Sequence, residues 1–196
     1  EKYSEIQWTK ADNEKFDFSN MNICMIYSPE GLAIVEYGAN EILGYCPTEY
    51  VNSNLISCRL NYGQGLNKTS QKIIAYLADL NTISIQDLVA QQNIAQISHD
   101  SKIDFLELNK SGNKLIFRDR KRHLYLYYIF EKKKTTLLNF CGFVQWVPNS
   151  EVLVAQERKN VCVWYNVDDP DKVKIIPVKG DVEEIRRKEG KTEVIV

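Results

Sequence analysis

Three adjacent residues of the chain, Ser98, His99 and Asp100, are of the types that form a hydrolase triad. In a triad the carboxylate orients the imidazole, and the imidazole takes the proton of the serine hydroxyl. Three consecutive side chains cannot fold back on one another to make both hydrogen bonds. His99 therefore has three interpretations: a buried structural residue, which we favour, an exposed turn histidine, or a catalytic base.

The other residues that could take part in catalysis or ligand binding do not assemble into a site. Gly63-Gln64-Gly65 resembles a phosphate cradle, but no lysine-serine pair and no helix pattern follow it. The five cysteines form no C-x-x-C pair, and neither histidine is spaced from them as a metal ligand. We therefore predict no catalytic, cofactor-binding or metal-binding residue, no cofactor and no enzyme activity.

The overall charge restricts the classes of partner. Lys+Arg 25 against Asp+Glu 26 gives a formal net charge of −1, which provides no general attraction to a polyanion. We expect no nucleic acid as partner. No apolar run is long enough to span a bilayer, and the chain starts with polar residues, so we expect a cytoplasmic protein. Contact with a membrane surface is left open.

Two clusters of cations stand out against this balance: Arg118, Arg120, Lys121 and Arg122 in the first, and Lys132, Lys133 and Lys134 in the second. The strand pattern places them at opposite ends of one strand, roughly 20 Å apart. They are therefore not one patch. They are either solvated hairpin tips that protect sheet edges or separate docking sites for acidic partners.

These residues must be positioned by a module of short strands that recurs at about forty residues, a period typical of propeller blades. Its third strand reads NICMIYS (22–28), KIIAYLA (72–78), KLIFRDR (114–120) and EVLVAQE (151–157). Its fourth reads LAIVEYG (32–38), TISIQDL (82–88), HLYLYYI (123–129) and NVCVWYN (160–166). The segments are rich in β-branched and aromatic residues and are separated by turn signals.

The pattern predicts an all-β fold, a WD40-type β-propeller fragment of four blades plus two or three strands of a fifth. We expect the blades at residues 1–38, 39–89, 90–129 and 130–167, with the partial blade at 168–196. Strands of the fifth are predicted at VKIIPV (173–178), VEEI (182–185) and TEVIV (192–196). A second strand of the first blade is predicted at KFDFS (15–19), and a long loop at 61–70.

Four residues are candidates for the packed core of this propeller: His99, Phe105, Trp146 and Trp164. His99 lies just before a predicted strand, where a histidine of WD-type repeats braces its blade through buried hydrogen bonds. The large aromatic rings are expected to fill the space between radial sheets.

Two long strings carry a more specific resemblance: SHDSKIDFLELNKSGNKLIFRDRK (98–121) and FVQWVPNSEVLVAQERKNVCVWYN (143–166). They resemble the second WD-repeat propeller of the large WD-repeat subunits of the intraflagellar transport machinery. Shorter matches extend the resemblance over nearly the whole chain. Phe105 stands where that family leads us to expect a tryptophan, a change compatible with packing.

The resemblance implies a non-enzymatic scaffold that belongs to intraflagellar transport complex B and acts in cilium assembly and intraciliary transport. It implies other complex B subunits as partners, together with the missing blades and a helical-repeat solenoid. It implies a location in the cytoplasm, at the ciliary base and in the cilium. Two rivals stay open at this point: a coat-type vesicle-trafficking scaffold and a propeller enzyme.

Overall fold

The computed structural model describes residues 4–9, 23–28, 31–36, 41–61 and 71–196. These residues contain strands and turns and no helix, so the predicted all-β class is confirmed. Among them there is accordingly no helix that could cross a membrane. The predicted strand at 15–19 and nearly all of the predicted loop at 61–70 lie outside the described residues.

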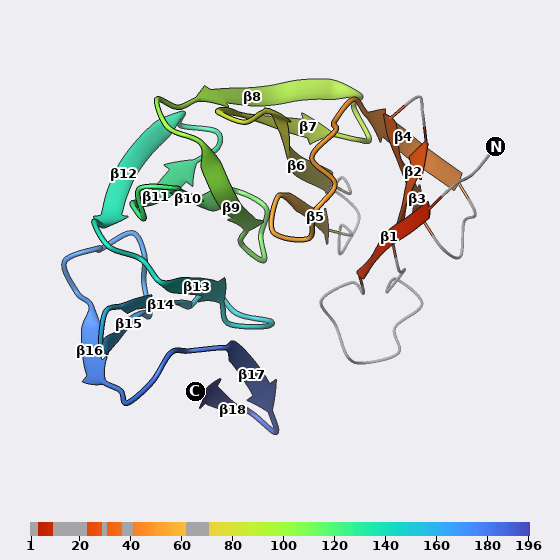
Figure 1. Ribbon diagram of the computed structural model, residues 1–196. Helices are drawn as coiled ribbons and strands as arrows, with labels where there is room; N and C mark the ends of the chain where they lie inside the picture. The colour runs from red at the N-terminus through yellow and green to blue at the C-terminus, as the bar shows by residue number, and fades with distance from the viewer. Residues whose placement is uncertain (1–3, 10–22, 29–30, 37–40, 62–70) are drawn as a thin grey trace.

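The strands form five antiparallel sheets that follow one another around an open arc (Figure 1). The first sheet contains, in spatial order, β1 (Ser4–Thr9), β2 (Ile23–Ser28), β3 (Gly31–Glu36) and β4 (Glu41–Cys46). The second contains β5 (Ile56–Asn61), β6 (Gln71–Asp79), β7 (Thr82–Asp87) and β8 (Gln92–Ser98).

The third sheet contains β9 (Ile103–Leu108), β10 (Lys114–Asp119), β11 (Leu124–Tyr128) and β12 (Lys133–Leu138). The fourth contains β13 (Phe143–Trp146), β14 (Leu153–Glu157), β15 (Asn160–Trp164) and β16 (Lys174–Pro177). The fifth is the pair β17 (Glu184–Lys188) and β18 (Lys191–Ile195). Four sheets and part of a fifth agree with the predicted propeller fragment.

The sheets extend one strand beyond the predicted blades. β4, β8, β12 and β16 each pair with the strand before them in the chain, although each lies within the next predicted blade. VKIIPV (173–178) is a correction of the same kind, because its strand β16 pairs with β15 in the fourth sheet and not with the fifth. The other two strands predicted for the fifth sheet correspond to β17 and β18.

Burial along each strand follows its place in the sheet. The middle strands β7, β10, β14 and β15 are buried along most of their length, because neighbouring sheets cover both of their faces. The last strands β8 and β12 alternate between exposed and less exposed residues, and β16 is exposed throughout. In the second to fourth sheets the first strand lies towards the middle of the arc and the last strand at its rim (Figure 1).

A separate apolar core fills each gap between consecutive sheets. Leu32 and Ile74 represent the cluster between the first and second sheets, and Ile85 and Leu106 the cluster between the second and third. Two further clusters lie between the third and fourth and between the fourth and fifth sheets. Burying one large aliphatic side chain contributes about 1.5–3 kcal/mol. Contacts between sheets, rather than within one sheet, therefore hold the arc together.

The predicted core residues lie in these gaps to different extents. Trp164 and Trp146 are 2% and 4% exposed and belong to the cluster between the third and fourth sheets. The indole Nε1 of Trp146 donates to the carbonyl oxygen of Glu107 in the third sheet, at 3.2 Å. His99 is 9% exposed. Phe105 is only half-buried, and it packs against the edge of the cluster that contains the two tryptophans.

Two glutamine side chains connect the fourth sheet to the fifth. Gln145 Nε2 donates to the carbonyl oxygen of Ile185, and its Oε1 accepts from the amide of the same residue, both at 3.0 Å. Gln156 Oε1 accepts from the amide of Val182 at 2.7 Å, and its Nε2 donates to Gly180 at 2.9 Å. Each amide group thereby satisfies backbone groups as a neighbouring strand would.

Candidate functional site

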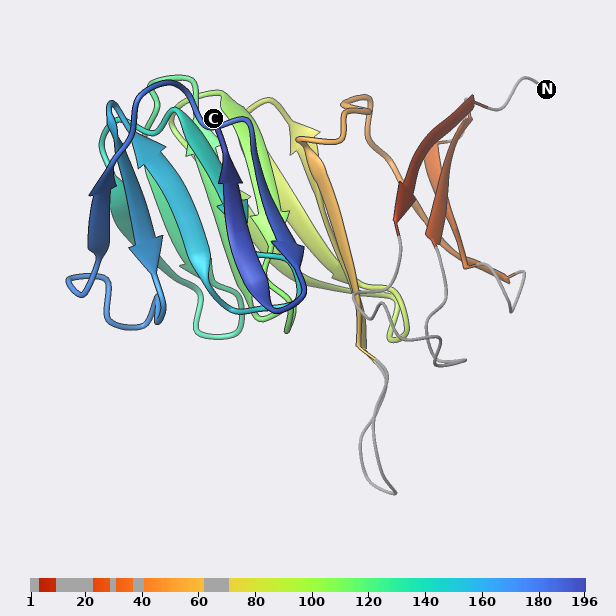
Figure 2. The ribbon, with the colours of Figure 1, turned by 90° about the horizontal axis from the view of Figure 1, so that it is seen from below.

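The turns gather at two ends of the upright strands (Figure 2). Buried side chains organise the turn between β10 and β11. Its centre is the buried carboxylate of Asp119. His99 Nε2 lies 3.1 Å from Asp119 Oδ2, and the backbone amide of His123 donates to Oδ1 at 2.9 Å. His123 Nδ1 lies 3.3 Å from Oδ2. The carboxylate thus connects the chain entering the third sheet with a hairpin tip of that sheet.

Aromatic rings close the apolar side of this network. The imidazole of His99 meets Tyr125 edge-on, with 4.8 Å between the ring centroids, and Phe117 in the same manner at 5.4 Å. Phe117 and Tyr125 stack on each other. The favoured interpretation of His99 as a buried structural residue accounts for these contacts.

The surroundings of Asp119 change its acidity. Burial by itself would raise the pKa of this carboxyl, but the hydrogen bonds from His99 and His123 favour the ionised form and outweigh it. The pKa of Asp119 is therefore below its ordinary value. The carboxylate is a fixed negative charge that holds the turn in one conformation.

The adjacent Ser98, His99 and Asp100 do not form a triad in the structure. Asp119 is the nearest carboxylate to the His99 ring, at 3.1 Å, and Asp100 lies farther away at 3.4 Å from the same nitrogen. Ser98 is the last residue of β8, paired with Thr82. A triad needs its serine and its carboxylate on different ring nitrogens, whereas both carboxylates here face Nε2.

The two predicted cationic clusters lie at opposite ends of β11, as the sequence indicated. Arg120, Lys121 and Arg122 are exposed in the turn between β10 and β11. Lys132, Lys133 and Lys134 are exposed around the turn between β11 and β12. The Lys134 ammonium lies 5.1 Å from the centroid of the Tyr125 ring.

Arg118 differs from its neighbours in the first cluster. Its Nε donates to Asp104 Oδ1 at 2.8 Å, and its Nη1 donates to the carbonyl oxygen of Gly142 at 2.5 Å. The side chain is 14% exposed. Arg118 thus connects the third sheet to the segment that enters the fourth. Its charge is used in these internal contacts and is not available to a partner.

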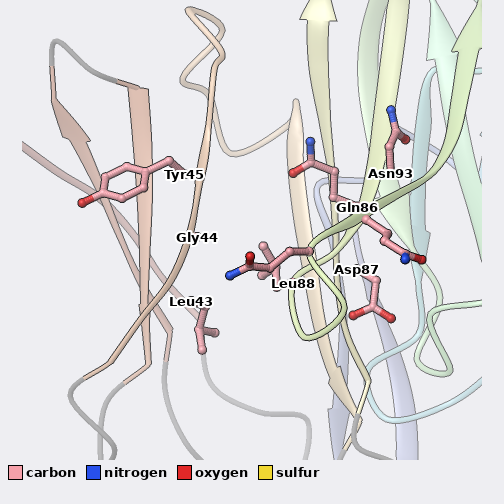
Figure 3. A pocket seen from close by; sticks show the side chains of 9 residues that line it. Leu43, Gly44, Tyr45, Gln86, Asp87, Leu88 and Asn93 are labelled. Carbon is pink, nitrogen blue, oxygen red and sulfur yellow. The ribbon is translucent and has the colours of Figure 1, made fainter.

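A cavity of about 300 Å³ lies between the first and second sheets, lined by β4 on one side and by the β7–β8 hairpin on the other (Figure 3). Leu88 reaches towards β4 at Gly44, whereas Tyr45 points away from the other labelled side chains. Gln86 donates to the Tyr76 hydroxyl at 2.9 Å, and Asp87 accepts from the amides of the following turn. No motif of the sequence pointed to this cavity, and Gln86 and Asp87 use their polar groups within the fold.

Metal and thiol chemistry find no support among the described residues. No three His, Cys, Asp or Glu side chains within them are grouped to hold a metal ion. Burial raises the pKa of the Cys46 thiol to about 12, and it does the same for Cys141. A thiol with such a pKa is almost fully protonated at neutral pH and is a poor nucleophile. The absence of enzyme activity stays a prediction.

The role of Asp119 was not predicted from the sequence, where cations surround this residue. The signal that could have revealed it is a pair of positions: a histidine entering the sheet and an acid in the tight turn twenty residues later. The turn is tight because the amide of Arg122 donates to the carbonyl oxygen of Asp119 at 3.0 Å.

Radial four-stranded sheets with a core in each gap define a β-propeller domain. The solved structure of the computationally designed Ika8 protein shares this arrangement, with a TM-score of 0.55 at 11% identity, over 88% of this chain and 52% of that one. Residues 3–175 match the family model of the IFT80 second beta-propeller, and the chain belongs to that family.

Curated relatives resemble the chain over its whole length. It is 53% identical over 196 residues to the intraflagellar transport protein 172 homolog of Danio rerio, and 50% identical over 197 residues to intraflagellar transport protein 172 of Chlamydomonas reinhardtii. Identity to intraflagellar transport protein osm-1 of Caenorhabditis elegans is 38% over 196 residues. Each of these matches includes 100% of this chain, which spans only 11% of the length of each relative.

Proposed function

We propose that the chain is a non-enzymatic scaffold domain of the intraflagellar transport machinery, acting within complex B in cilium assembly and transport. The observation that carries this proposal is the identity of about half of all residues, along the entire chain, to proteins named for intraflagellar transport. The same similarity disfavours the coat-type vesicle scaffold. The expected locations are the cytoplasm, the ciliary base and the cilium.

The geometry supports a scaffold role because it holds exposed turns on a braced framework. In three consecutive gaps between sheets a side-chain oxygen accepts a hydrogen bond from a backbone amide across the gap: Ser57 from Leu108, Glu107 from Trp146 and Gln156 from Val182. Apolar contacts fill the same gaps. A framework of this kind presents turns in a fixed arrangement, which lowers the ordering cost of binding a partner. Its partners are proposed to be other complex B subunits and the remaining segments of the full-length protein.

A replacement experiment tests the role. The corresponding segment of the Chlamydomonas reinhardtii relative is replaced by this chain in cells that lack the endogenous protein, and flagellar length is measured. We expect flagella to form and other transport subunits to co-precipitate with the chimeric protein.

The matched control carries the destabilising change Trp146→Ala in the same chimera. The proposal is contradicted if the unmodified chimera accumulates to the normal level but neither restores flagella nor co-precipitates transport subunits. Recovery of vesicle-coat components in their place would favour the rejected rival.

A further inference from the structure

A group of exposed cations spans the third and fourth sheets at one end of the strands. We call it the basic face and define it by Arg120, Lys121, Arg122, Phe140, Arg158 and Lys159. The first three occupy the turn between β10 and β11, and the last two occupy the turn between β14 and β15. Phe140 lies between them in the connection from β12 to β13 and is 46% exposed.

Two contacts show that these turns adjoin one another. The amide of Cys141, next to Phe140, donates to the carbonyl oxygen of Arg122 at 2.7 Å. The guanidinium carbon of Arg158 lies 5.7 Å from the centroid of the Phe140 ring. The basic face is therefore continuous across two sheets, although Arg122 and Arg158 are far apart in the sequence.

The cations of the basic face are not neutralised by the described part of the chain. No carboxylate of the described residues lies within ion-pair distance of any of them. The nearest buried acid, Asp119, is occupied by His99 and His123. Other acids lie at the same end: Asp100 follows His99 and Glu157 precedes Arg158 in the sequence, Asp104 is bonded to Arg118, and Asp181 lies between two residues that bond Gln156. The face is therefore rich in cations without being free of carboxylates.

Two arginines of the basic face occupy backbone conformations that favour glycine. The φ angles of Arg122 and Arg158 are 72° and 55°. A side chain in this left-handed region costs free energy that glycine would avoid. Both turns nevertheless place an exposed arginine there, and the Arg158 guanidinium lies over the exposed Phe140 ring. Gln91, Lys132, Asn149 and Glu189 have the same conformation at other hairpin turns, so it is a property of the turns, and it allows glycine to replace these arginines without backbone strain.

We propose that the basic face is a docking site for an extended acidic segment of a partner protein. Sheets about 10 Å apart, with strands that rise about 3.3 Å per residue, give the face room for a segment of roughly four to eight residues. Phe140 and the Arg158 guanidinium offer an apolar and planar surface that suits carboxylate side chains and peptide groups. The inference rests on the proposed role as an interaction scaffold and specifies the chemistry of one partner.

An acidic protein segment fits this face better than a nucleic acid or a bilayer does. Asp100 and Glu157 interrupt the cations, and a continuous array of phosphates would be repelled at those points. The whole chain has a formal net charge of −1, so it offers no broad attraction that would hold a polyanion in many registers.

The test measures binding of a fluorescent octa-glutamate peptide to the whole chain by anisotropy, at low and at physiological salt. The double variant Arg122→Gly and Arg158→Gly removes two cations and also relieves the unfavourable backbone conformation. We expect its affinity for the peptide to fall by about tenfold, as loss of two partly screened ion pairs predicts. Its melting temperature should equal or exceed that of the parent chain, so misfolding cannot explain the loss.

The matched control is Lys132→Gly with Lys133→Gln. Lys132 also has a positive φ, of 53°, but both lysines lie at the opposite end of β11. This control loses the same charge and should keep full affinity. Equal weakening in both double variants, or no binding by the parent chain, would overturn the inference.

Competing ligands separate this partner from others. An eight-nucleotide oligothymidine or vesicles containing phosphatidylserine, if bound more tightly than the peptide, would also overturn it. The peptide assay tests the basic face alone, whereas flagellar rescue tests the transport role. If peptide binding fails while flagellar rescue succeeds, the docking proposal is wrong. If rescue fails while the peptide binds, the transport role is wrong.

Discussion

His99 and Asp119 lie twenty residues apart in the sequence, and their side chains meet with 3.1 Å between Nε2 and Oδ2. His99 belongs to the connection between the second and third sheets, and Asp119 ends the second strand of the third. One hydrogen bond thus couples the position of a whole sheet to the shape of its exposed turn.

Substitution of Asp119 tests this coupling. Asp119→Asn keeps the shape but loses the charge and one acceptor, and we expect a loss of about 1–3 kcal/mol in the free energy of unfolding. Asp119→Ala should cost more, because it leaves several buried donors unpaired. Urea denaturation gives both values. A change below 0.5 kcal/mol in Asp119→Ala would show that the turn is held by other contacts.

The same carboxylate predicts a dependence on pH. The folded-state pKa of Asp119 lies below its ordinary value of 3.8, so the unfolded chain binds the proton more readily. The stabilisation is complete above the unfolded-state pKa and is lost as pH falls through the folded-state pKa. Denaturation between pH 5 and about 2.5 should therefore be shallower for Asp119→Asn than for the parent chain. Parallel curves would contradict the prediction.

Trp146 provides a test of the contact between the third and fourth sheets. Trp146→Ala should reduce the free energy of unfolding by about 3–5 kcal/mol, because it removes a large ring from a core that cannot collapse fully. Trp146→Phe retains most of the ring and loses the hydrogen bond to Glu107, so it should cost less than Trp146→Ala. Similar small losses in both variants would place the ring outside the packed core.

Alanine substitution of two glycines with positive φ tests whether a steric contact adds to the cost of an unfavourable backbone conformation. Gly31 has a φ of +125°, and an added Cβ would lie 2.9 Å from the carbonyl oxygen of Cys46. Gly190 has a φ of +76°, with no atom within 4 Å of that position. Gly190→Ala should cost about 1–2 kcal/mol through conformation alone. Gly31→Ala should cost clearly more, and equal midpoints in thermal denaturation would refute the steric account.

Thiol accessibility tests the packing between sheets. Burial raises the pKa values of Cys46 and Cys141 to about 12, and it also raises that of Cys162. Brief alkylation with iodoacetamide at pH 8, followed by peptide mass spectrometry, should leave these three cysteines unmodified. All three should react once guanidinium chloride is present. Rapid labelling of Cys141 in the native chain would show that the gap between the third and fourth sheets opens readily.

The strand runs could be predicted because their composition is distinctive. KLIFRDR (114–120) is almost the observed β10, and its apolar residues are buried on both faces. The grouping of strands into sheets could not be predicted as well. Four residues separate β8 from β7, and four separate it from β9, so the length of the connections does not reveal the strand with which β8 pairs.

The basic face shows the same limitation more strongly. Arg120 to Arg122 are conspicuous in the sequence, whereas Arg158 and Lys159 form a dipeptide without distinction. Their proximity depends on two sheets packing so that Phe140 lies beside both turns. The cations could be recognised from the sequence. That the two cationic turns lie side by side could be known only from the arrangement of the sheets.

The side-chain amides of Gln145 and Gln156 hydrogen-bond to main-chain groups of Gly180, Val182 and Ile185, in the segment that enters and begins the fifth sheet. Main-chain groups are the same in nearly every sequence, so these hydrogen bonds do not depend on side-chain identity, whereas the apolar cluster at the same boundary requires buried side chains such as Val182 and Ile185. A neighbouring sheet that keeps its backbone position and its apolar residues at Val182 and Ile185 retains both kinds of contact, whatever its exposed residues are. The seam between the fourth and fifth sheets thus specifies its neighbour by backbone position and apolar burial, and not by particular polar side chains.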